Sequence, residues 1–123
     1  MTSRKFSVRE RGNSFAYAWA GIRTFFNNEH NARIHLALTV AAVAGGFLLD
    51  IARSDWMILI VVIAMVWAAE LFNTALEKIM DFVSPGKHPQ VKMVKDLSAA
   101  AVLVSALAAV ISGCIIFLPK ILK

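Results

Sequence analysis

The sequence predicts an all-α membrane protein in which an N-terminal amphipathic surface helix precedes three transmembrane helices. Hydrophobic residues make up 59% of the 123 residues. One domain of this length buries only part of its apolar surface, so lipid is the natural solvent for the rest. Inside lipid the backbone pairs its polar groups only in a helix or a closed barrel, and three apolar segments are too few for a barrel. The spans are therefore predicted to be helices.

The first predicted element is a helix over about residues 7–30. Four apolar side chains share one helical stripe at i, i+4, i+7 and i+11: Phe15, Trp19, Ile22 and Phe26. Polar side chains flank the stripe: Arg9, Arg11, Arg23 and Asn27. This pattern predicts a helix that lies on the membrane surface. A soluble amphipathic helix docked on the bundle has the same periodicity and remains an alternative.

The three transmembrane spans are expected at about residues 33–51, 55–81 and 96–118. Crossing the hydrocarbon core takes about 20 apolar residues. The third span meets this length easily, and the first is marginal. The second is long enough only if its charged last turns lie at the membrane interface. Small residues are frequent in the first and third spans, which favours close packing in a bundle.

Lysine and arginine are unevenly distributed, and this predicts the orientation. Six precede the first span: Arg4, Lys5, Arg9, Arg11, Arg23 and Arg33. The short connection after that span has only Arg53. The second connection is expected to hold Lys78, Lys87, Lys92 and Lys95. The positive-inside rule therefore puts the N-terminus and the second connection in the cytoplasm.

Composition also excludes several classes of protein. The net charge of +5 is typical of loops that face anionic lipid, and no dense basic run with interleaved aromatics indicates nucleic-acid binding. A single cysteine, Cys114, allows no internal disulfide and argues against a thiolate metal site, because no second thiol exists. The first apolar run begins only near Ile34, which argues against a cleavable signal peptide.

The candidate chemistry lies at the end of the second span. Glu70, Asn73 and Glu77 recur at i, i+3 and i+7, with Thr74 and Asp81 close to the same stripe. The carboxylates of Glu70 and Glu77 lie on one helix face, about 10 Å apart along the axis. Glu70 follows a long apolar run, and an ionisable group at that depth usually faces an interior or a functional site. A buried pair with a lysine or arginine is the alternative.

The predicted topology gathers most acidic residues at one membrane face. Six of the eight acids lie there: Glu10, Glu29, Glu70, Glu77, Asp81 and Asp96. Four lysines lie beside them. Carboxylate oxygens and ammonium groups together are what a Mg²⁺–phosphate site requires, although exposed charges can also have no role. The phosphate-binding loops and kinase motifs of soluble enzymes are absent from the sequence, so a kinase would have to be of another design.

These residues resemble a known family. Residues 69–81, AELFNTALEKIMD, are similar to the signature E-x-x-N-[ST]-A-[IL]-E-x-x-x-D of the prokaryotic diacylglycerol kinase and undecaprenol kinase family of integral membrane lipid kinases. Lys95-Asp96 followed by residues 98–103 looks like the second conserved block of that family, and residues 17–23 with Asn28-Glu29 match its surface-helix region. The resemblance covers nearly the whole chain, which implies one lipid kinase domain over residues 1–123.

The resemblance implies roles for individual residues in a homotrimer with composite active sites and Mg-ATP as donor. Glu70 would be the catalytic base, and Glu29 and Glu77 would hold the metal. The residues expected to contact ATP are Tyr17, Glu29, Glu77, Gly86, Lys87, His88, Lys95 and Asp96. Those expected to bind or orient the lipid substrate are Trp19, Glu70, Asn73 and Ala99.

The acceptor implied by the resemblance is a lipid alcohol in a bacterial inner membrane, with the active site on the cytoplasmic side. Residues 31–35, NARIH, depart from the enteric diacylglycerol kinase pattern. Within them residues 33–35, RIH, resemble the undecaprenol kinase branch, as does the linker 84–89, SPGKHP. Undecaprenol is therefore favoured over diacylglycerol. His35 could also be an interfacial histidine without a ligand role.

Two other classes of protein remain as alternatives. A small membrane transporter would use Glu70 as a proton or substrate relay, but it favours a charge nearer the midplane and inverted repeats. A structural membrane protein would merely pair its acids with lysines, and it predicts no dependence on ATP.

Overall fold

This computed structural model describes residues 5–123, which form four α-helices and the segments that connect or flank them. The helices are α1 (Val8–Asn28), α2 (His30–Leu48), α3 (Arg53–Val83) and α4 (Pro89–Ile121). The chain divides into two units, of which one ends at Arg33 and the other comprises Ile34–Lys123. The prediction of an all-α protein is confirmed. Arg4, counted for the orientation, lies outside the described residues.

The first unit consists mainly of α1. Ser7 caps its start, because the Ser7 Oγ accepts a hydrogen bond of 3.3 Å from the backbone N–H of Glu10. The helix ends at Asn28, and Glu29 has an extended backbone with φ −119° and ψ 122°. Two successive asparagines, which have low helix propensity, precede this break. Glu29 therefore lies at the junction between α1 and α2. The predicted helix over residues 7–30 had placed it inside one helix.

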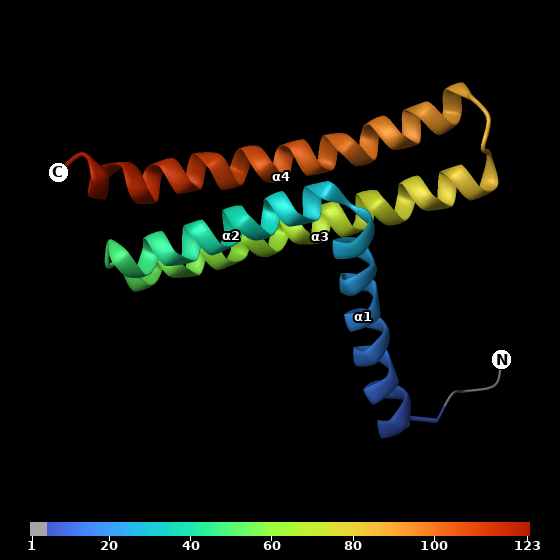
Figure 1. The fold of residues 1–123 in the computed structure, drawn as a ribbon, viewed down its shortest axis with the longest axis horizontal. Helices are drawn as coiled ribbons and strands as arrows, with labels where there is room; N and C mark the ends of the chain where they lie inside the picture. The colour runs from blue at the N-terminus through green and yellow to red at the C-terminus, as the bar shows by residue number, and fades with distance from the viewer. Residues whose placement is uncertain (1–4) are drawn as a thin grey trace. The chain divides into compact units, whose positions relative to one another are not determined.

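In the second unit α2, α3 and α4 lie side by side (Figure 1). The hairpin between α2 and α3 turns at Asp50, whose φ of 50° lies in the left-handed region that aspartate tolerates better than most residues. Gly46 allows the two helices to meet closely, because an added Cβ would lie 2.6 Å from Cη2 of Trp56. The N-terminal part of α3 and the C-terminal part of α4 then share a small core with the hairpin, centred on Ile51, Leu59 and Ile116.

Within residues 5–123, α2, α3 and α4 are long and apolar enough to cross a membrane. Between 11% and 22% of the residues in their most apolar windows are buried within the chain, so most of their apolar side chains face outward. Such a surface is stable in lipid or against other copies of the chain. The three predicted spans therefore correspond to three observed helices.

The helix limits differ from the predicted spans. The first span was expected to reach residue 51, whereas α2 ends at Leu48. The third was expected to begin near residue 96, whereas α4 begins at Pro89. Proline suits the first helical position, and the His88 Nδ1 caps the helix by accepting a hydrogen bond of 3.1 Å from the Gln90 N–H.

This longer α4 corrects the predicted second connection, which comprises only residues 84–88. Lys92 and Lys95 lie on the first turns of α4, and Lys78 lies on α3. Of the four lysines placed in the connection, Lys87 alone belongs to it.

Candidate functional site

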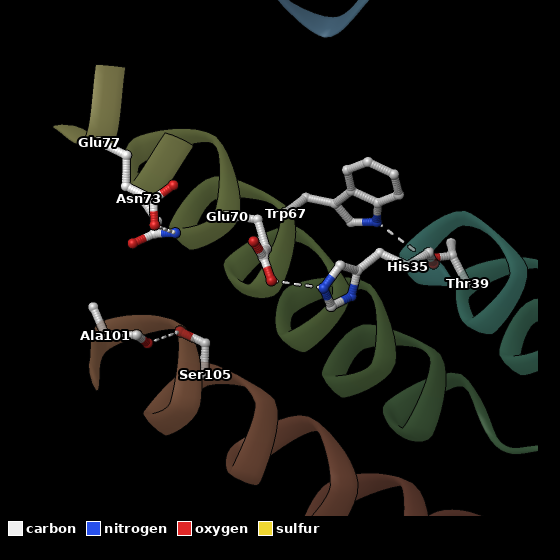
Figure 2. Close-up of polar contacts among 8 residues, drawn as sticks. All are labelled: His35, Thr39, Trp67, Glu70, Asn73, Glu77, Ala101 and Ser105. Atoms are coloured by element: carbon white, nitrogen blue, oxygen red, sulfur yellow. Dashed lines mark hydrogen bonds and ion pairs between the residues drawn. The ribbon is translucent and has the colours of Figure 1, made fainter. Parts of the chain in front are cut away.

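The centre of the candidate site is a buried pair between α2 and α3. Glu70 on α3 is 6% exposed, and its Oε1 lies 2.7 Å from Nε2 of His35 on α2 (Figure 2). An ionised carboxylate can only accept hydrogen bonds, so an ionised Glu70 requires the proton on Nε2 of His35. The buried pairing considered for Glu70 therefore exists, but its partner is a histidine rather than a lysine or arginine.

A second set of hydrogen bonds fixes the surroundings of His35. The Thr39 Oγ1 donates to the backbone carbonyl of His35 over 2.7 Å and accepts a hydrogen bond of 3.0 Å from Nε1 of Trp67. The rings of His35 and Trp67 lie 6.3 Å apart between centroids. Since Trp67 and Glu70 are one helical turn apart on α3, both face the same turn of α2. Polar contacts thus fix the register of the two helices at the imidazole (Figure 2).

Asn73 connects the next turn of α3 to α4. Its Nδ2 donates to Oε1 of Glu77 over 3.2 Å, and its Oδ1 accepts a hydrogen bond of 2.8 Å from Oγ of Ser98. Asn73 was expected to orient Glu70 or the substrate, and its hydrogen bonds go instead to Glu77 and Ser98. Ser98 was not among the predicted site residues, although it is buried and directly precedes Ala99.

The end of α3, the loop and the start of α4 surround an open depression of about 780 Å³. Five residues expected to contact ATP line it together: Gly86, Lys87, His88, Lys95 and Asp96. Two ion pairs of 2.6 Å lie at its edge, between Lys95 and Asp81 and between Lys92 and Asp96. Lys87 is exposed and forms no ion pair within residues 5–123, whereas Lys92 and Lys95 would have to leave their aspartates to bind an anion.

The remaining predicted site residues belong to the first unit or to α4. Tyr17 and Trp19 are exposed on α1, and Glu29 lies at the C-terminal cap of that helix, all in the first unit. Ala99 is exposed on α4.

An apolar cavity of about 230 Å³ opens next to the buried pair, among α2, α3 and α4. His35, Thr39 and Trp67 form its polar end, and residues such as Leu59, Ala106 and Phe117 line the rest. The cavity therefore runs along the apolar part of the helices and ends at the imidazole that contacts Glu70.

The carboxylates of residues 5–123 do not form a ready-made metal cage, since no three or more His, Cys, Asp or Glu side chains meet there. Glu77 is half-buried and has one oxygen held by Asn73. Mg²⁺ is commonly held by one or two carboxylates plus the phosphate oxygens of a nucleotide, and it keeps several waters. The donor set around Glu77 fits a magnesium ion that arrives with a nucleotide.

Sequence comparison finds relatives that match most of the chain. The family model described as prokaryotic diacylglycerol kinase matches residues 16–117. Undecaprenol kinase from Bacillus subtilis (strain 168) is 38% identical over 108 residues, which are 88% of each chain. Diacylglycerol kinase from a Synechocystis species is 40% identical over 111 residues, 89% of this chain and 63% of that protein. Diacylglycerol kinase from Escherichia coli (strain K12) is 31% identical over 100 residues, 81% of this chain and 82% of that protein.

Proposed function

This chain belongs to the prokaryotic diacylglycerol kinase family, and on that premise we propose that it transfers the γ-phosphoryl group of ATP to undecaprenol in the membrane. Diacylglycerol is the second candidate acceptor. The observation that carries the proposal is Glu70, a carboxylate buried in a membrane-length helix beside an apolar cavity. The C-terminal end of the same helix borders the depression that three lysines line. A lipid kinase needs these three features together, since its two substrates come from lipid and from water.

Glu70 would act as the general base on the lipid hydroxyl. The hydroxyl oxygen forms a bond to the γ-phosphorus, its proton passes to the Glu70 carboxylate, and the bond to the bridging oxygen of ADP breaks. The transition state of phosphoryl transfer is loose, so positioning and charge neutralisation carry most of the catalysis. A carboxylate with one oxygen already held by His35 meets the need for positioning.

The nucleotide would bind in the depression, with Lys87, Lys95 and His88 near its phosphates and with Gly86, Asp96 and Tyr17 as further contacts. Lys95 would exchange Asp81 for phosphate, which is a cheap exchange because the aspartate side chain is 66% exposed. Glu77 and Glu29 would hold Mg²⁺. When bound, the ion neutralises charge on the phosphate oxygens in the transition state. Trp19, Asn73 and Ala99 would lie on the lipid side of the site.

The preference for undecaprenol rests on two observations. Undecaprenol kinase from Bacillus subtilis matches this chain over 88% of both lengths, whereas the chain spans 63% of the Synechocystis diacylglycerol kinase. Residues 33–35 and the linker 84–89 also resemble the undecaprenol kinase branch. Diacylglycerol remains an acceptor to be tested, because relatives of that name match as well.

We further propose that the protein works as a homotrimer in the bacterial cytoplasmic membrane, with its N-terminus and the 84–88 loop in the cytoplasm. Large apolar side chains along α4 are exposed in the single chain, among them Leu103, Val104 and Leu107, which leaves a surface for other copies. The lysine and arginine distribution supports the orientation, and ATP is available on that side.

The test is phosphate transfer by the purified protein in mixed detergent–lipid micelles with Mg-ATP. Undecaprenol and diacylglycerol are offered separately at equal mole fraction, and labelled phosphate in each lipid is counted. Higher kcat/KM for undecaprenol supports the proposed acceptor, and higher kcat/KM for diacylglycerol makes the protein a phosphatidate-forming enzyme. Transfer to neither lipid by folded protein overturns the assignment as a lipid kinase and favours the transporter.

A further inference from the structure

We propose that His35 is a positioning residue for the reaction, holding one oxygen of Glu70 so that the other faces the lipid hydroxyl. The inference rests on the proposed role of Glu70 as the base. It begins from the burial of the pair, in which the side chains of His35 and Glu70 are 19% and 8% exposed. An ionised carboxylate at this depth is costly without a hydrogen-bond donor, and the imidazole supplies one at 2.7 Å.

The chemical type of the partner suits a base. A lysine or arginine beside a carboxylate favours the charged form and makes it a weaker proton acceptor. A neutral imidazole fixes one oxygen with an N–H and adds no net charge. His35 can therefore orient Glu70 while leaving its second oxygen able to take a proton.

The imidazole is itself held in place, as a positioning residue must be. The Thr39 hydroxyl bonds to the backbone carbonyl of His35 and receives the indole N–H of Trp67, and the indole ring lies beside the imidazole. Figure 2 shows the imidazole directed from α2 toward Glu70, with the indole on the same side of α3. Two helices thus determine where the Nε2 atom lies, and the Nε2 atom determines where the carboxylate points.

The cavity gives this placement a consequence for the substrate. His35 lies at the polar end of the apolar cavity, whose other walls carry no charged side chain. If the chain of a lipid occupied that cavity, its polar head would lie next to the imidazole and the carboxylate. A misplacement of about 1 Å at such a point can cost about 100-fold in rate.

The experiment compares His35→Leu, which removes the donor, with His35→Gln, whose amide N–H can reach a similar position. We expect His35→Leu to lower kcat about 100-fold with an unchanged KM for ATP, and His35→Gln to recover at least a tenth of the wild-type kcat. Ser105→Ala is the matched control, because Ser105 is also a polar residue inside the bundle but donates to the backbone carbonyl of Ala101 in its own helix. Its kcat should equal that of the wild type.

A double variant separates positioning from a merely structural role. If His35 acts through Glu70, His35→Leu should cause no further loss in a Glu70→Gln background. Additive losses, or a His35→Leu protein with wild-type kcat, overturn the inference. Equal activity of the Leu and Gln variants does so too. If His35→Leu does not fold by circular dichroism, His35→Phe takes its place. The wild-type protein is assayed in the same experiment with the better of the two lipids, so a failure of the proposed function appears as an inactive wild type.

Discussion

Ionisable side chains pair in two different settings in the second unit, and the contrast bears on how the proposed site would bind and react. The buried pair, Glu70 with His35, has side chains that are 8% and 19% exposed. The exposed pairs, Lys92–Asp96 and Lys95–Asp81, have side chains between 37% and 78% exposed. The distances are nearly the same, at 2.7 and 2.6 Å. Exposure and not distance is therefore the property that differs.

Exposure decides whether a pair can exchange partners. Breaking a buried pair leaves a charge without water or a partner, so we expect the buried pair to keep its geometry when substrates bind. Breaking an exposed pair costs little, since water replaces the partner. Under the proposed mechanism, the lysines of the exposed pairs would turn to the phosphates of a nucleotide, whereas the carboxylate of the buried pair would stay in place for the lipid.

The largest expected effect follows from changing the buried pair at its reactive group. Glu70→Gln keeps the size and hydrogen-bonding capacity of the side chain but cannot accept the hydroxyl proton. We expect kcat to fall by about 10²–10⁴-fold, the usual contribution of a general base. Phosphate transfer in mixed micelles measures the loss, and circular dichroism checks that the helices remain. Near-normal turnover would remove Glu70 from the role of base.

The second effect concerns Glu77, whose exposure is intermediate between those of the buried and the exposed pairs. It is half-buried and accepts a hydrogen bond from Asn73. Glu77→Gln keeps that hydrogen bond but loses the charge that would attract Mg²⁺. The Mg²⁺ concentration for half-maximal activity should rise about 10-fold or more, with helix content unchanged. An unchanged Mg²⁺ titration contradicts its assignment as a metal ligand. Asn73→Ala is the companion variant, because it frees the carboxylate without removing its charge and should shift the titration less.

Sequence patterns predicted the helices of this molecule well, and the contrast between the two settings shows why. The three long apolar segments and the stripe of Glu70, Asn73 and Glu77 are properties of single helices, which periodicity reveals directly. The pairing of Glu70 with His35 depends on how α2 and α3 align across the connection at Asp50. Counted from the ends of α2 and α3 at that connection, the two residues interrupt their apolar segments within about one helical turn of each other, which is the signal that could have indicated the pair.

Other parts of the site could not be predicted from patterns in one helix. The hydrogen bond from Ser98 to Asn73 depends on the packing of α4 against α3, and a serine in an alanine-rich run gives no sign of it. The early start of α4 depends on His88 and Pro89 acting together, whereas hydropathy alone begins the span at the first apolar run. As a result Lys92 and Lys95 lie on a rigid helix and not in a loop.

The third prediction tests the exposed pairs as a source of ligand charge. Lys95→Ala should raise the KM for ATP about 10-fold through loss of one phosphate contact, and it should change the free energy of unfolding by less than about 1 kcal/mol. Asp81→Asn breaks the same ion pair but leaves the lysine in place, so its KM should rise less. Equal rises in KM for the two variants would mean that the ion pair itself, rather than the lysine, supports nucleotide binding.

The smallest effect is expected at Lys92, the most exposed member of these pairs. Its bond to Asp96 joins neighbouring turns of α4, an arrangement worth about 0.3–0.5 kcal/mol, and methionine keeps the length and helix propensity of the side chain. Lys92→Met should therefore change the free energy of unfolding in detergent by less than about 0.5 kcal/mol. The variant also leaves Asp96 without this ion-pair partner. A change in the KM for ATP would show that Lys92 positions the Asp96 carboxylate for contact with the nucleotide. A loss of stability above about 1 kcal/mol would mean that the pair belongs to a larger network of interactions. The cost of breaking a pair would then not differ between exposed and buried pairs in this protein.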